Sequence, residues 1–312
     1  MGLVSNDRSF RSLLKQGIEQ LRAAHVPSYT LAAELLLLHV ARRDRTWLYS
    51  HAEEVFSPEI SEDYFALLRR RAFGEPTQHL TGKQEFWGHE FEVNADVLIP
   101  RPETEHLIEV ALDRLAVREV RAGRPPRLDG EGIAIVDIGT GSGCIAITLA
   151  KELTSASIYA TDISEAALEV ARRNAGRLGV SDRIQFLESN LLEVFPQSQV
   201  TGHESPFFDL IISNPPYVSL RDAESLPIEV RDHEPHAALF GGEEGYELYA
   251  ALISQAARHL KPGGLLILEL GYNSLPAVQP LLETKEWINV CVTMDLAGVP
   301  RVIAAERLSP SP

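Results

Sequence analysis

The sequence predicts an α/β protein in which a small all-helical N-terminal domain is joined by a β-hairpin to a doubly wound, mostly parallel seven-stranded sheet. From Ile133 onward, short apolar runs alternate with helical patterns, which indicates a parallel sheet covered by helices. Residues 8–74 instead repeat their apolar side chains at helical spacing. We therefore expect a helical domain at 1–75, a hairpin linker at 76–100 and the sheet domain at 101–312.

Composition and charge restrict the class of protein. The chain has 312 residues, of which 45% are hydrophobic, so it can bury a large core and form two domains. The formal charge of −15 argues against direct binding to nucleic acid, because phosphates favour Lys- and Arg-rich surfaces. Cys144 and Cys291 are too isolated to form a disulfide framework or zinc motif, which fits a reducing cytoplasm. No apolar run approaches the ~20 residues that span a bilayer. We expect a cytoplasmic monomer without membrane contacts.

The N-terminal domain is expected to contain three main helices. An apolar stripe runs along residues 10–21, Pro27 separates it from a leucine-rich helix at 31–38, and Ser57-Pro58 is a favourable start for the third. The arginines at 69–71 fall in the last turn, where the helix dipole favours cations, and we interpret them as a solvated helix end. Such a domain fits substrate recognition, although the residues do not identify the partner.

The segments outside the helical domain are predicted to be a hairpin linker, surface connectors and the strands of the sheet. Aromatic and β-branched residues at 78–99 predict the β-hairpin, in which we expect Phe86 and Trp87 to pack between the domains. Two connectors, at 118–131 and 197–205, are interpreted as surface insertions. The strands of the sheet are expected at residues 133–138, 158–162, 184–187, 207–213 and 265–270, followed by a closing hairpin from 288–292 and 302–305.

A glycine-rich turn joins the first strand of the sheet to its helix. It reads Gly139-Thr140-Gly141-Ser142-Gly143, and its glycines allow a sharp turn and the close approach of a ligand. Asp162 ends the next strand, about 20 residues further on, where a carboxylate accepts hydrogen bonds from a ribose diol. A tight turn and a helix-entry carboxylate could each be structural, but their occurrence at successive strand ends favours a ligand site.

The stretch Asn214-Pro215-Pro216-Tyr217 follows the apolar strand that ends at residue 213. Neither proline can donate a ladder hydrogen bond, so the chain leaves the sheet at Asn214, at the edge where open α/β sheets bind ligands. The Asn214 side-chain oxygen and the Pro215 carbonyl are two acceptors, and Tyr217 adds an aromatic face. This arrangement suits a planar group with an NH2, either a carboxamide or the exocyclic amine of a base.

The glycine turn resembles that of S-adenosylmethionine-dependent methyltransferases. Its pattern is Gly-x-Gly-x-Gly, with Asp137 two positions earlier. The resemblance implies a Rossmann-like methyltransferase sheet that binds S-adenosyl-L-methionine, with Asp162 holding the ribose hydroxyls. Asn214 and Asn190 complete the implied cofactor contacts. Asn190 stands where related enzymes often carry a carboxylate or an aromatic residue near the adenine.

Residues 80–105, 234–245 and 296–302, together with Asn-Pro-Pro-Tyr, resemble the HemK/PrmC family, the protein-(glutamine-N5) methyltransferases of peptide chain release factors. The resemblance implies that the substrate is the glutamine of the Gly-Gly-Gln motif in class 1 release factors. Asn214 and Pro215 would accept hydrogen bonds from its NH2, and Tyr217 would flank the amide plane. The implied catalytic residues are Asn214, Pro215 and Tyr217, and Pro216 joins them in substrate binding.

Three other functions are compatible with part of the sequence. The substrate could be a glutamine of a ribosomal protein, which only the N-terminal domain would distinguish. Adenine-N6 methylation of nucleic acid uses the same tetrapeptide but calls for a basic recognition region and base flipping. A non-catalytic adaptor would have no need of Asn214. A metal enzyme is disfavoured, because the acidic and histidine residues at 232–236 match no metal template, and we predict no metal.

Overall fold

The structure is a computed structural model that describes residues 7–48, 50–121, 129–195 and 208–308. The chain forms two compact units, one of residues 1–83 with 227–233, the other of residues 84–226 with 234–312. No helix within the described ranges has both the length and the apolar character needed to cross a bilayer.

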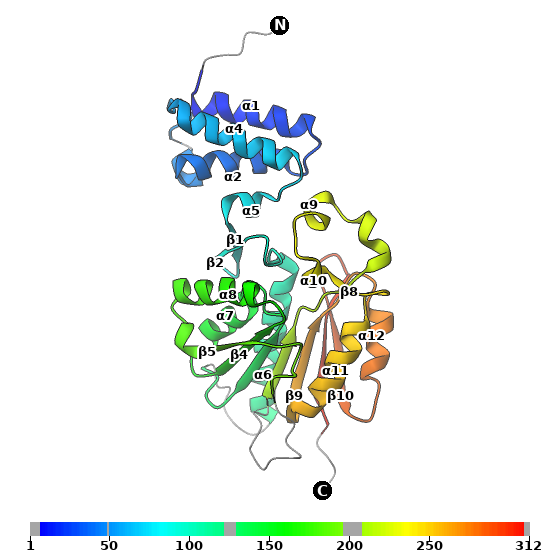
Figure 1. Cartoon of the computed structure of the whole chain (residues 1–312). Helices are drawn as coiled ribbons and strands as arrows, with labels where there is room; N and C mark the ends of the chain where they lie inside the picture. Colours follow the sequence, from blue (N-terminus) through cyan, green and yellow to red (C-terminus); the bar gives the residue numbers. More distant parts are fainter. Residues whose placement is uncertain (1–6, 49, 122–128, 196–207, 309–312) are drawn as a thin grey trace. The chain divides into compact units, whose positions relative to one another are not determined.

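The first unit is helical, as expected. Its helices, seen in Figure 1, are α1 (Phe10–Ala23), α2 (Tyr29–Ala41), α3 (Arg45–Leu48), α4 (Pro58–Ala72), α5 (Thr77–Thr81) and α9 (Ile228–Arg231). The Ser57 hydroxyl caps α4 by accepting from the Ile60 N–H at 3.5 Å. Tyr64 of α4 is fully buried and donates to the Ala33 carbonyl of α2 at 3.1 Å. Helices α1, α2 and α4 share one apolar core.

The interpretation of residues 69–71 as a solvated helix end is wrong for one of the three arginines. Arg71 is only 5% exposed, and its guanidinium pairs with the Glu229 carboxylate of α9. Its Nη1 also donates to the Glu75 carbonyl at 3.3 Å. Arg70 is exposed and pairs with the Glu75 side chain at 2.5 Å. The pairing of Arg71 with a residue 158 positions away could not be inferred from local helix chemistry.

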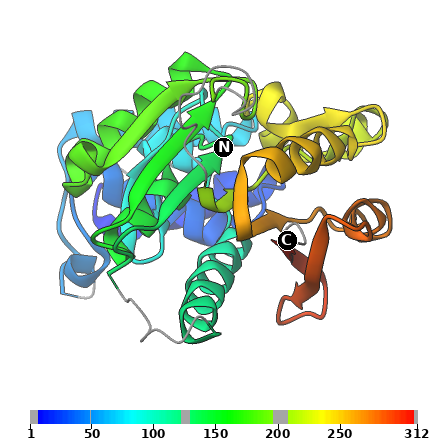
Figure 2. The ribbon, with the colours of Figure 1, turned by 90° about the horizontal axis from the view of Figure 1, so that it is seen from below.

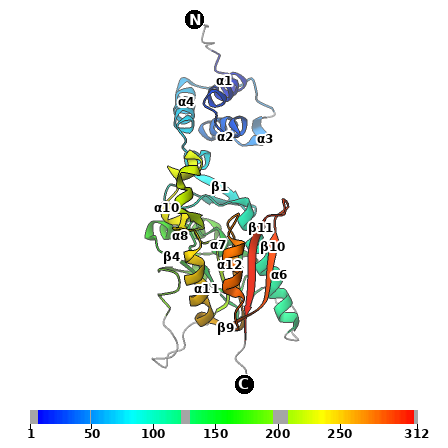
Figure 3. The ribbon, with the colours of Figure 1, turned by 90° about the vertical axis from the view of Figure 1, so that its right-hand side faces the viewer.

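The second unit contains the predicted seven-stranded sheet. Its strands are β3 (Ala134–Ile138), β4 (Ser157–Asp162), β5 (Ile184–Glu188), β6 (Phe208–Ser213), β9 (Leu260–Glu269), β10 (Trp287–Met294) and β11 (Pro300–Arg307). They lie in the order β10-β11-β9-β6-β3-β4-β5. The first five in sequence are parallel, whereas β11 runs antiparallel to both β9 and β10, which forms the expected closing hairpin (Figure 3).

Helices cover both faces of this sheet (Figure 2). One face packs on α6 (Glu105–Arg121), α7 (Cys144–Glu152) and α8 (Glu165–Leu178) through side chains such as Ile135 and Ile212. The other packs on α11 (Glu247–His259) and α12 (Leu275–Leu282) through Ile211 and Leu266. Successive residues of β6 thus serve opposite cores, which is why this strand is apolar almost throughout.

A separate hairpin of β1 (Lys83–Phe86) and β2 (His89–Glu92) precedes the sheet. Its turn lies at Trp87 and Gly88, which both have positive φ. Phe86 packs within the core of the second unit, where its ring centroid is 6.1 Å from that of Phe91. Trp87 donates from Nε1 to the Glu152 carboxylate at 2.8 Å. Packing of this pair between domains was therefore a wrong expectation.

The two predicted connectors lie mainly outside the described residues. Helix α6 continues to Arg121, three residues beyond the expected start of the first connector at 118. Residues 122–128 and 197–205 belong to the ranges that the structure leaves undescribed.

Candidate active site

A cavity of about 250 Å³ lies in the second unit, at the carboxyl ends of β3, β4 and β6. In the sheet, β3 lies between β4, the next strand in the sequence, and β6, which comes later in the sequence. Doubly wound sheets bind ligands at the point where the strand order reverses in this way. The Ser213 hydroxyl joins the two strands by donating to the Ile138 carbonyl at 2.7 Å. The predicted site residues that line the cavity are Gly139, Gly141, Asp162, Asn190, Asn214, Pro215 and Pro216.

Hydrogen bonds to the neighbouring strand β4 hold the glycine turn in place. The N–H groups of Gly139 and Thr140 both donate to the Thr161 carbonyl, at 2.8 and 2.9 Å. Gly139 and Gly141 have φ values of 69° and 53°, which side chains rarely adopt. A Cβ at either position would meet no protein atom within 4 Å. Both glycines line the cavity, so the empty space above them is available to a ligand.

Asp137 of β3 anchors this turn from inside the core. Its Oδ2 accepts from the Thr140 hydroxyl at 2.6 Å and from the Ala146 N–H of α7 at 3.2 Å. The side chain is fully buried, and burial raises its pKa to about 7 against the opposing effect of these hydrogen bonds. Asp137 therefore fixes the path of the turn and does not itself line the cavity.

Asp162 lines the cavity and connects two further elements. Its Oδ2 accepts from the Gly141 N–H at 2.9 Å, and its Oδ1 accepts from the Ser164 N–H at 2.9 Å. Burial raises the pKa of this carboxyl, while the backbone donors oppose the shift. Each carboxylate oxygen has more than one lone pair, so the side chain can still accept from a ligand.

Three residues of the predicted cofactor site, Thr140, Ser142 and Gly143, do not line the cavity. The Thr140 hydroxyl is used by Asp137. The Ser142 carbonyl accepts from Asn174 of α8 at 2.9 Å. A Cβ at Gly143 would lie 2.8 Å from Ile147 and 3.1 Å from Ala171. These residues shape the turn and its packing, whereas Gly139 and Gly141 face the open space.

Asn190 lies beyond the end of β5 at the rim of the cavity. Its side chain is exposed, and its Nδ2 donates to the Glu193 carboxylate at 2.8 Å. Its carbonyl oxygen is the group that remains to accept a hydrogen bond from a ligand.

Asn214 emerges from β6 with a defined side-chain contact. It is half-buried, and its Nδ2 lies 3.2 Å from the Thr104 Oγ1, to which it donates. Within the described part of the chain, no donor is recorded at its Oδ1 or at the Pro215 carbonyl. Both Asn214 and Pro215 line the cavity, so two acceptors are available at one wall.

The backbone after Asn214 is supported by a glycine-rich segment. Strand β7 (Val218–Ser219) pairs with β8 (Phe240–Gly242) in a small parallel sheet. A Cβ at Gly241 would lie 2.4 Å from the Pro216 carbonyl oxygen, and one at Gly245 would lie 2.6 Å from the Tyr217 carbonyl oxygen. Only glycine allows this approach, which explains why these glycines accompany the Asn-Pro-Pro-Tyr stretch.

The segment before β8 is fixed by an ion pair whose carboxylate is buried. Both oxygens of the Glu234 carboxylate accept from the Arg101 Nη2 at 2.7 Å. Glu234 is 5% exposed, and its neighbour Pro235 lines the cavity. The two sequence stretches around 100 and 235 therefore meet in this unit, and both border the site.

Tyr217 lies outside the cavity lining. Its ring packs against Gly271, where an added Cβ would be 2.7 Å away. Burial raises the pKa of its hydroxyl to about 12, and the carboxylate of Glu269 adds to this shift. Tyr217 thus supplies a neutral, fixed ring at the end of the tetrapeptide.

The wall formed by residues 96–98 was not predicted as part of the site. These residues follow the hairpin and line the cavity. Val97 is buried and belongs to a small apolar cluster with Ala167 of α8. The sequence contained a signal, since Leu98 begins the Leu-Ile-Pro-Arg-Pro stretch of residues 98–102, but only the position of these residues in space reveals the contact with the cavity.

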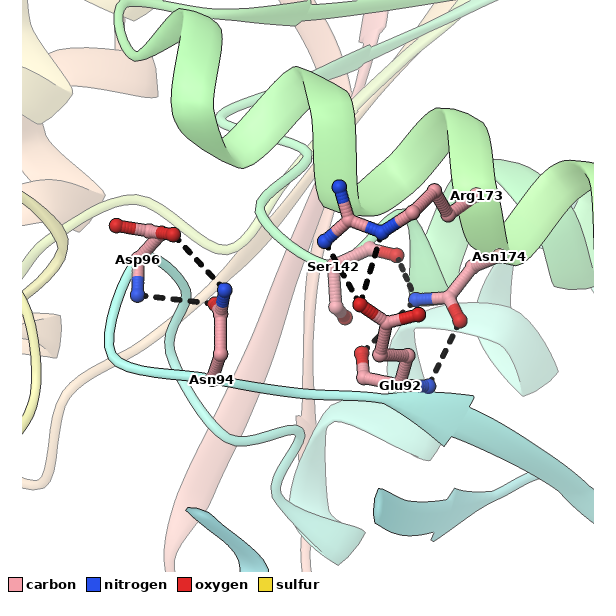
Figure 4. Close-up of polar contacts among 6 residues, drawn as sticks. All are labelled: Glu92, Asn94, Asp96, Ser142, Arg173 and Asn174. Carbon is pink, nitrogen blue, oxygen red and sulfur yellow. Dashed lines mark hydrogen bonds and ion pairs between the residues drawn. The ribbon is translucent and has the colours of Figure 1, made fainter. Parts of the chain in front are cut away.

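Asn174 of α8 holds the hairpin to the glycine turn (Figure 4). It is fully buried, and its Nδ2 donates to the carbonyls of Glu92 and Ser142 at 3.0 and 2.9 Å. Its Oδ1 accepts from the Glu92 N–H at 2.7 Å. The chain then turns at Asn94, whose Nδ2 donates to the Asp96 carboxylate at 2.8 Å. The Asn174 side-chain amide therefore links the glycine turn to the segment after the hairpin, which are two walls of the cavity.

We expect Asn174→Ala to lower the free energy of unfolding by about 2–3 kcal/mol, because it leaves three buried backbone groups without partners. Urea denaturation measures this change. The matched control is Arg173→Ala, since Arg173 is half-exposed and makes only a surface ion pair with Glu92 at 2.7 Å. Its loss is expected to cost less than about 1 kcal/mol. Equal losses in the two variants would contradict the role of Asn174.

Within the described ranges, no group of three or more His, Cys, Asp or Glu side chains is arranged to hold a metal ion.

Fold and site define the class of this protein as a methyltransferase. Residues 129–296 match the family described as "Methyltransferase domain", and residues 12–82 match "PrmC N-terminal domain". A solved structure, described as the hMettl16 catalytic domain in complex with MAT2A 3'UTR hairpin 6, shares the fold with a TM-score of 0.51 and 19% identity. That similarity covers 76% of this chain and 81% of that one.

Sequence relatives identify the family within this class. A protein named release factor glutamine methyltransferase from Koribacter versatilis is 40% identical over 299 residues, covering 96% of this chain and 99% of the relative. Another of that name, from Bradyrhizobium diazoefficiens, is 37% identical over 304 residues, covering 97% and 96%. The chain belongs to the release factor glutamine methyltransferase family.

Proposed function

We propose that this protein transfers a methyl group from S-adenosyl-L-methionine to the side-chain amide nitrogen (N5) of the glutamine in the Gly-Gly-Gln motif of class 1 release factors. The observation that carries the proposal is one cavity lined by Gly139, Gly141 and Asp162 on one side and by Asn214 and Pro215 on another. A cofactor site and two acceptors for an NH2 thus share one space. Family membership supports the choice of glutamine as the acceptor.

The residues of the glycine turn fit the cofactor. The space above Gly139 and Gly141 would receive it without a Cβ clash. Asp162 would accept hydrogen bonds from the ribose hydroxyls, and the Asn190 carbonyl oxygen would accept from the adenine end. Thr140, Ser142 and Gly143 would contribute by fixing the turn. When bound, S-adenosylmethionine supplies an electrophilic methyl group on its sulfonium.

The tetrapeptide fits the substrate amide. Asn214 Oδ1 and the Pro215 carbonyl would each accept one N–H of the glutamine NH2, while Pro216 and Tyr217 would hold the wall and flank the amide plane. An amide nitrogen is a poor nucleophile because its lone pair is delocalised into the carbonyl. Two fixed acceptors favour a more pyramidal nitrogen with a freer lone pair. Orientation and the exclusion of water would supply most of the rate.

No dedicated base is required, because the alkylated nitrogen becomes acidic and releases its proton readily. We further propose that the helical N-terminal residues 1–75 recognise the release factor, and that the protein acts as a monomer without binding nucleic acid directly. The net charge of −15 supports the last point.

A methyl-transfer assay tests the function. Purified protein is incubated with labelled S-adenosylmethionine and, separately, with a class 1 release factor, ribosomal proteins and DNA. We expect label on the release factor, mapped by mass spectrometry to the Gly-Gly-Gln glutamine. A release factor with asparagine at that position is the matched control and should remain unlabelled. Label on DNA or on a ribosomal protein but not on the release factor would replace this proposal with one of the alternatives.

A further inference from the structure

Behind Asn214 lies a short series of buried polar groups outside the cavity lining. Asn214 follows β6, and Glu269 is the last residue of β9. Ser213 pairs with Leu268 in the parallel register, so Asn214 and Glu269 leave the sheet side by side. Thr104, at the end of the 3-10 helix Pro102–Thr104, accepts from the Asn214 Nδ2 at 3.2 Å, and as a hydrogen-bond donor it opposes the rise that burial causes in the pKa of Glu269. Thr104 and Glu269 are 2% and 1% exposed, so water does not compete for these contacts.

The chemistry of these groups fixes the direction of each hydrogen bond. An ionised carboxylate accepts only, so when Glu269 is ionised the Thr104 hydroxyl directs its one hydrogen toward Glu269. The lone pairs of Thr104 Oγ1 then accept from the Asn214 amide, whose nitrogen lies 3.2 Å away. The Asn214 NH2 is therefore turned toward Thr104, and its carbonyl oxygen is left for the cavity. A carboxylate thus determines the orientation of an amide through one hydroxyl group.

We propose that Thr104 and Glu269 are positioning residues that keep the Asn214 side-chain oxygen directed at the acceptor nitrogen. The inference rests on the proposed function, in which Asn214 accepts a hydrogen bond from the substrate NH2. With its amide reversed, Asn214 would direct N–H groups at the substrate N–H groups, and one of the two acceptors would be lost. The two orientations of a free amide have the same shape, so only its hydrogen-bond partners distinguish them.

The protonation state of Glu269 decides whether this orientation is enforced. A protonated Glu269 can donate to Thr104, whose hydroxyl hydrogen is then free to point at Asn214. Burial raises the pKa of Glu269 from its ordinary value of 4.5 to about 7, so the change falls in the neutral range. The titratable and charged groups around Glu269 are Arg101 and Glu103 before and within the 3-10 helix, Arg301 of β11, Tyr217, Cys144 of α7 and Tyr249 of α11.

The first experiment compares Thr104→Val with Thr104→Ser. Valine matches threonine in shape but leaves the Asn214 NH2 without an acceptor, so we expect kcat for release factor methylation to fall about 10- to 100-fold. The Kd for S-adenosylmethionine should remain within about twofold, because Thr104 does not line the cavity. Serine restores the hydroxyl and should restore kcat to within about threefold of the unmodified protein. Wild-type kcat in Thr104→Val would overturn the proposal.

The second experiment is the pH profile of kcat, with Glu269→Gln as the comparison. In the unmodified protein kcat should rise as pH increases through about 7, because Glu269 becomes an obligatory acceptor. Stability should change in the opposite direction. A raised pKa means that the folded state binds more protons between pH 4.5 and about 7, so unfolding becomes easier as pH rises through this window. Glu269→Gln should lose the dependence of kcat on pH and should weaken the stability trend, to which Asp137, with its pKa of about 7, also contributes. A rise of kcat through pH 7 that persists in Glu269→Gln would contradict the role of Glu269.

A direct readout separates this inference from the proposed function. The Asn214 side-chain NH2 signals are identified by NMR as those missing from Asn214→Ala. We expect their hydrogen exchange to be slow in the unmodified protein and in Thr104→Ser, but fast in Thr104→Val. If the unmodified protein shows slow exchange of the Asn214 NH2 but methylates no release factor, the proposed function is rejected and the orientation of Asn214 is retained. Fast exchange in the unmodified protein would reject the orientation of Asn214 itself.

Discussion

The Asn214→Ala variant is expected to lose nearly all methyl transfer while it keeps its affinity for S-adenosylmethionine. Removing the side chain deletes one of the two acceptors at the cavity wall and leaves the Thr104 hydroxyl without the donor at 3.2 Å. Loss of one preorganised polar group at a reacting centre typically costs about 10²–10³-fold in kcat. Single-turnover kinetics on a release factor measure this loss, and calorimetry measures cofactor binding.

The matched control is Asn273→Ala. Asn273 also lies beyond the carboxyl end of a strand, but it is exposed and does not line the cavity. Its kcat should stay within about twofold of the unmodified protein, since surface substitutions away from a site have small effects. If Asn214→Ala loses cofactor affinity as strongly as turnover, Asn214 belongs to the cofactor site, and its role as an acceptor for the substrate NH2 is wrong.

The sequence predicted the fold and seven of the residues that line the cavity, because both depend on local patterns. The apolar run that ends in Asp162 and the one that precedes Asn214 define strands whose carboxyl ends meet at one edge of a parallel sheet. The glycine turn is recognisable for the same reason, since positive φ at Gly139 and Gly141 demands a particular residue type. Each of these features depends on only a few consecutive residues.

The residues that sequence reasoning missed act through contacts between distant segments. Thr104 reaches Asn214 across 110 positions, and Asn174 reaches Glu92 across 82. Glu269 comes beside Asn214 only because β9 neighbours β6 in the sheet, an order that periodicity does not reveal. Asparagine, threonine and glutamate are also ordinary surface residues, so their burial cannot be inferred from their type. The supporting groups behind a site are therefore harder to predict than the residues that face the ligand.

The Asp162→Ala variant is expected to lose affinity for S-adenosylmethionine by about 100-fold, or about 3 kcal/mol, because it removes the carboxylate that we propose accepts hydrogen bonds from the ribose hydroxyls. The change also removes the acceptor for the Gly141 N–H at 2.9 Å, which loosens the glycine turn. Isothermal calorimetry measures the affinity. The matched control is Glu188→Ala: Glu188 pairs with Asp162 in register at the end of β5, but it is exposed and does not line the cavity.

The pH dependence of cofactor binding gives an independent test of Asp162. Burial raises the pKa of its carboxyl, so protonation begins at a higher pH than for an exposed aspartate. A protonated carboxyl loses acceptor capacity, and affinity for S-adenosylmethionine should therefore weaken as pH falls. The Asp162→Asn variant cannot titrate, and its weaker affinity should stay constant over the same range. Wild-type affinity in both variants at every pH would show that Asp162 serves only to anchor Gly141 and Ser164, and the ribose would then be held by another group.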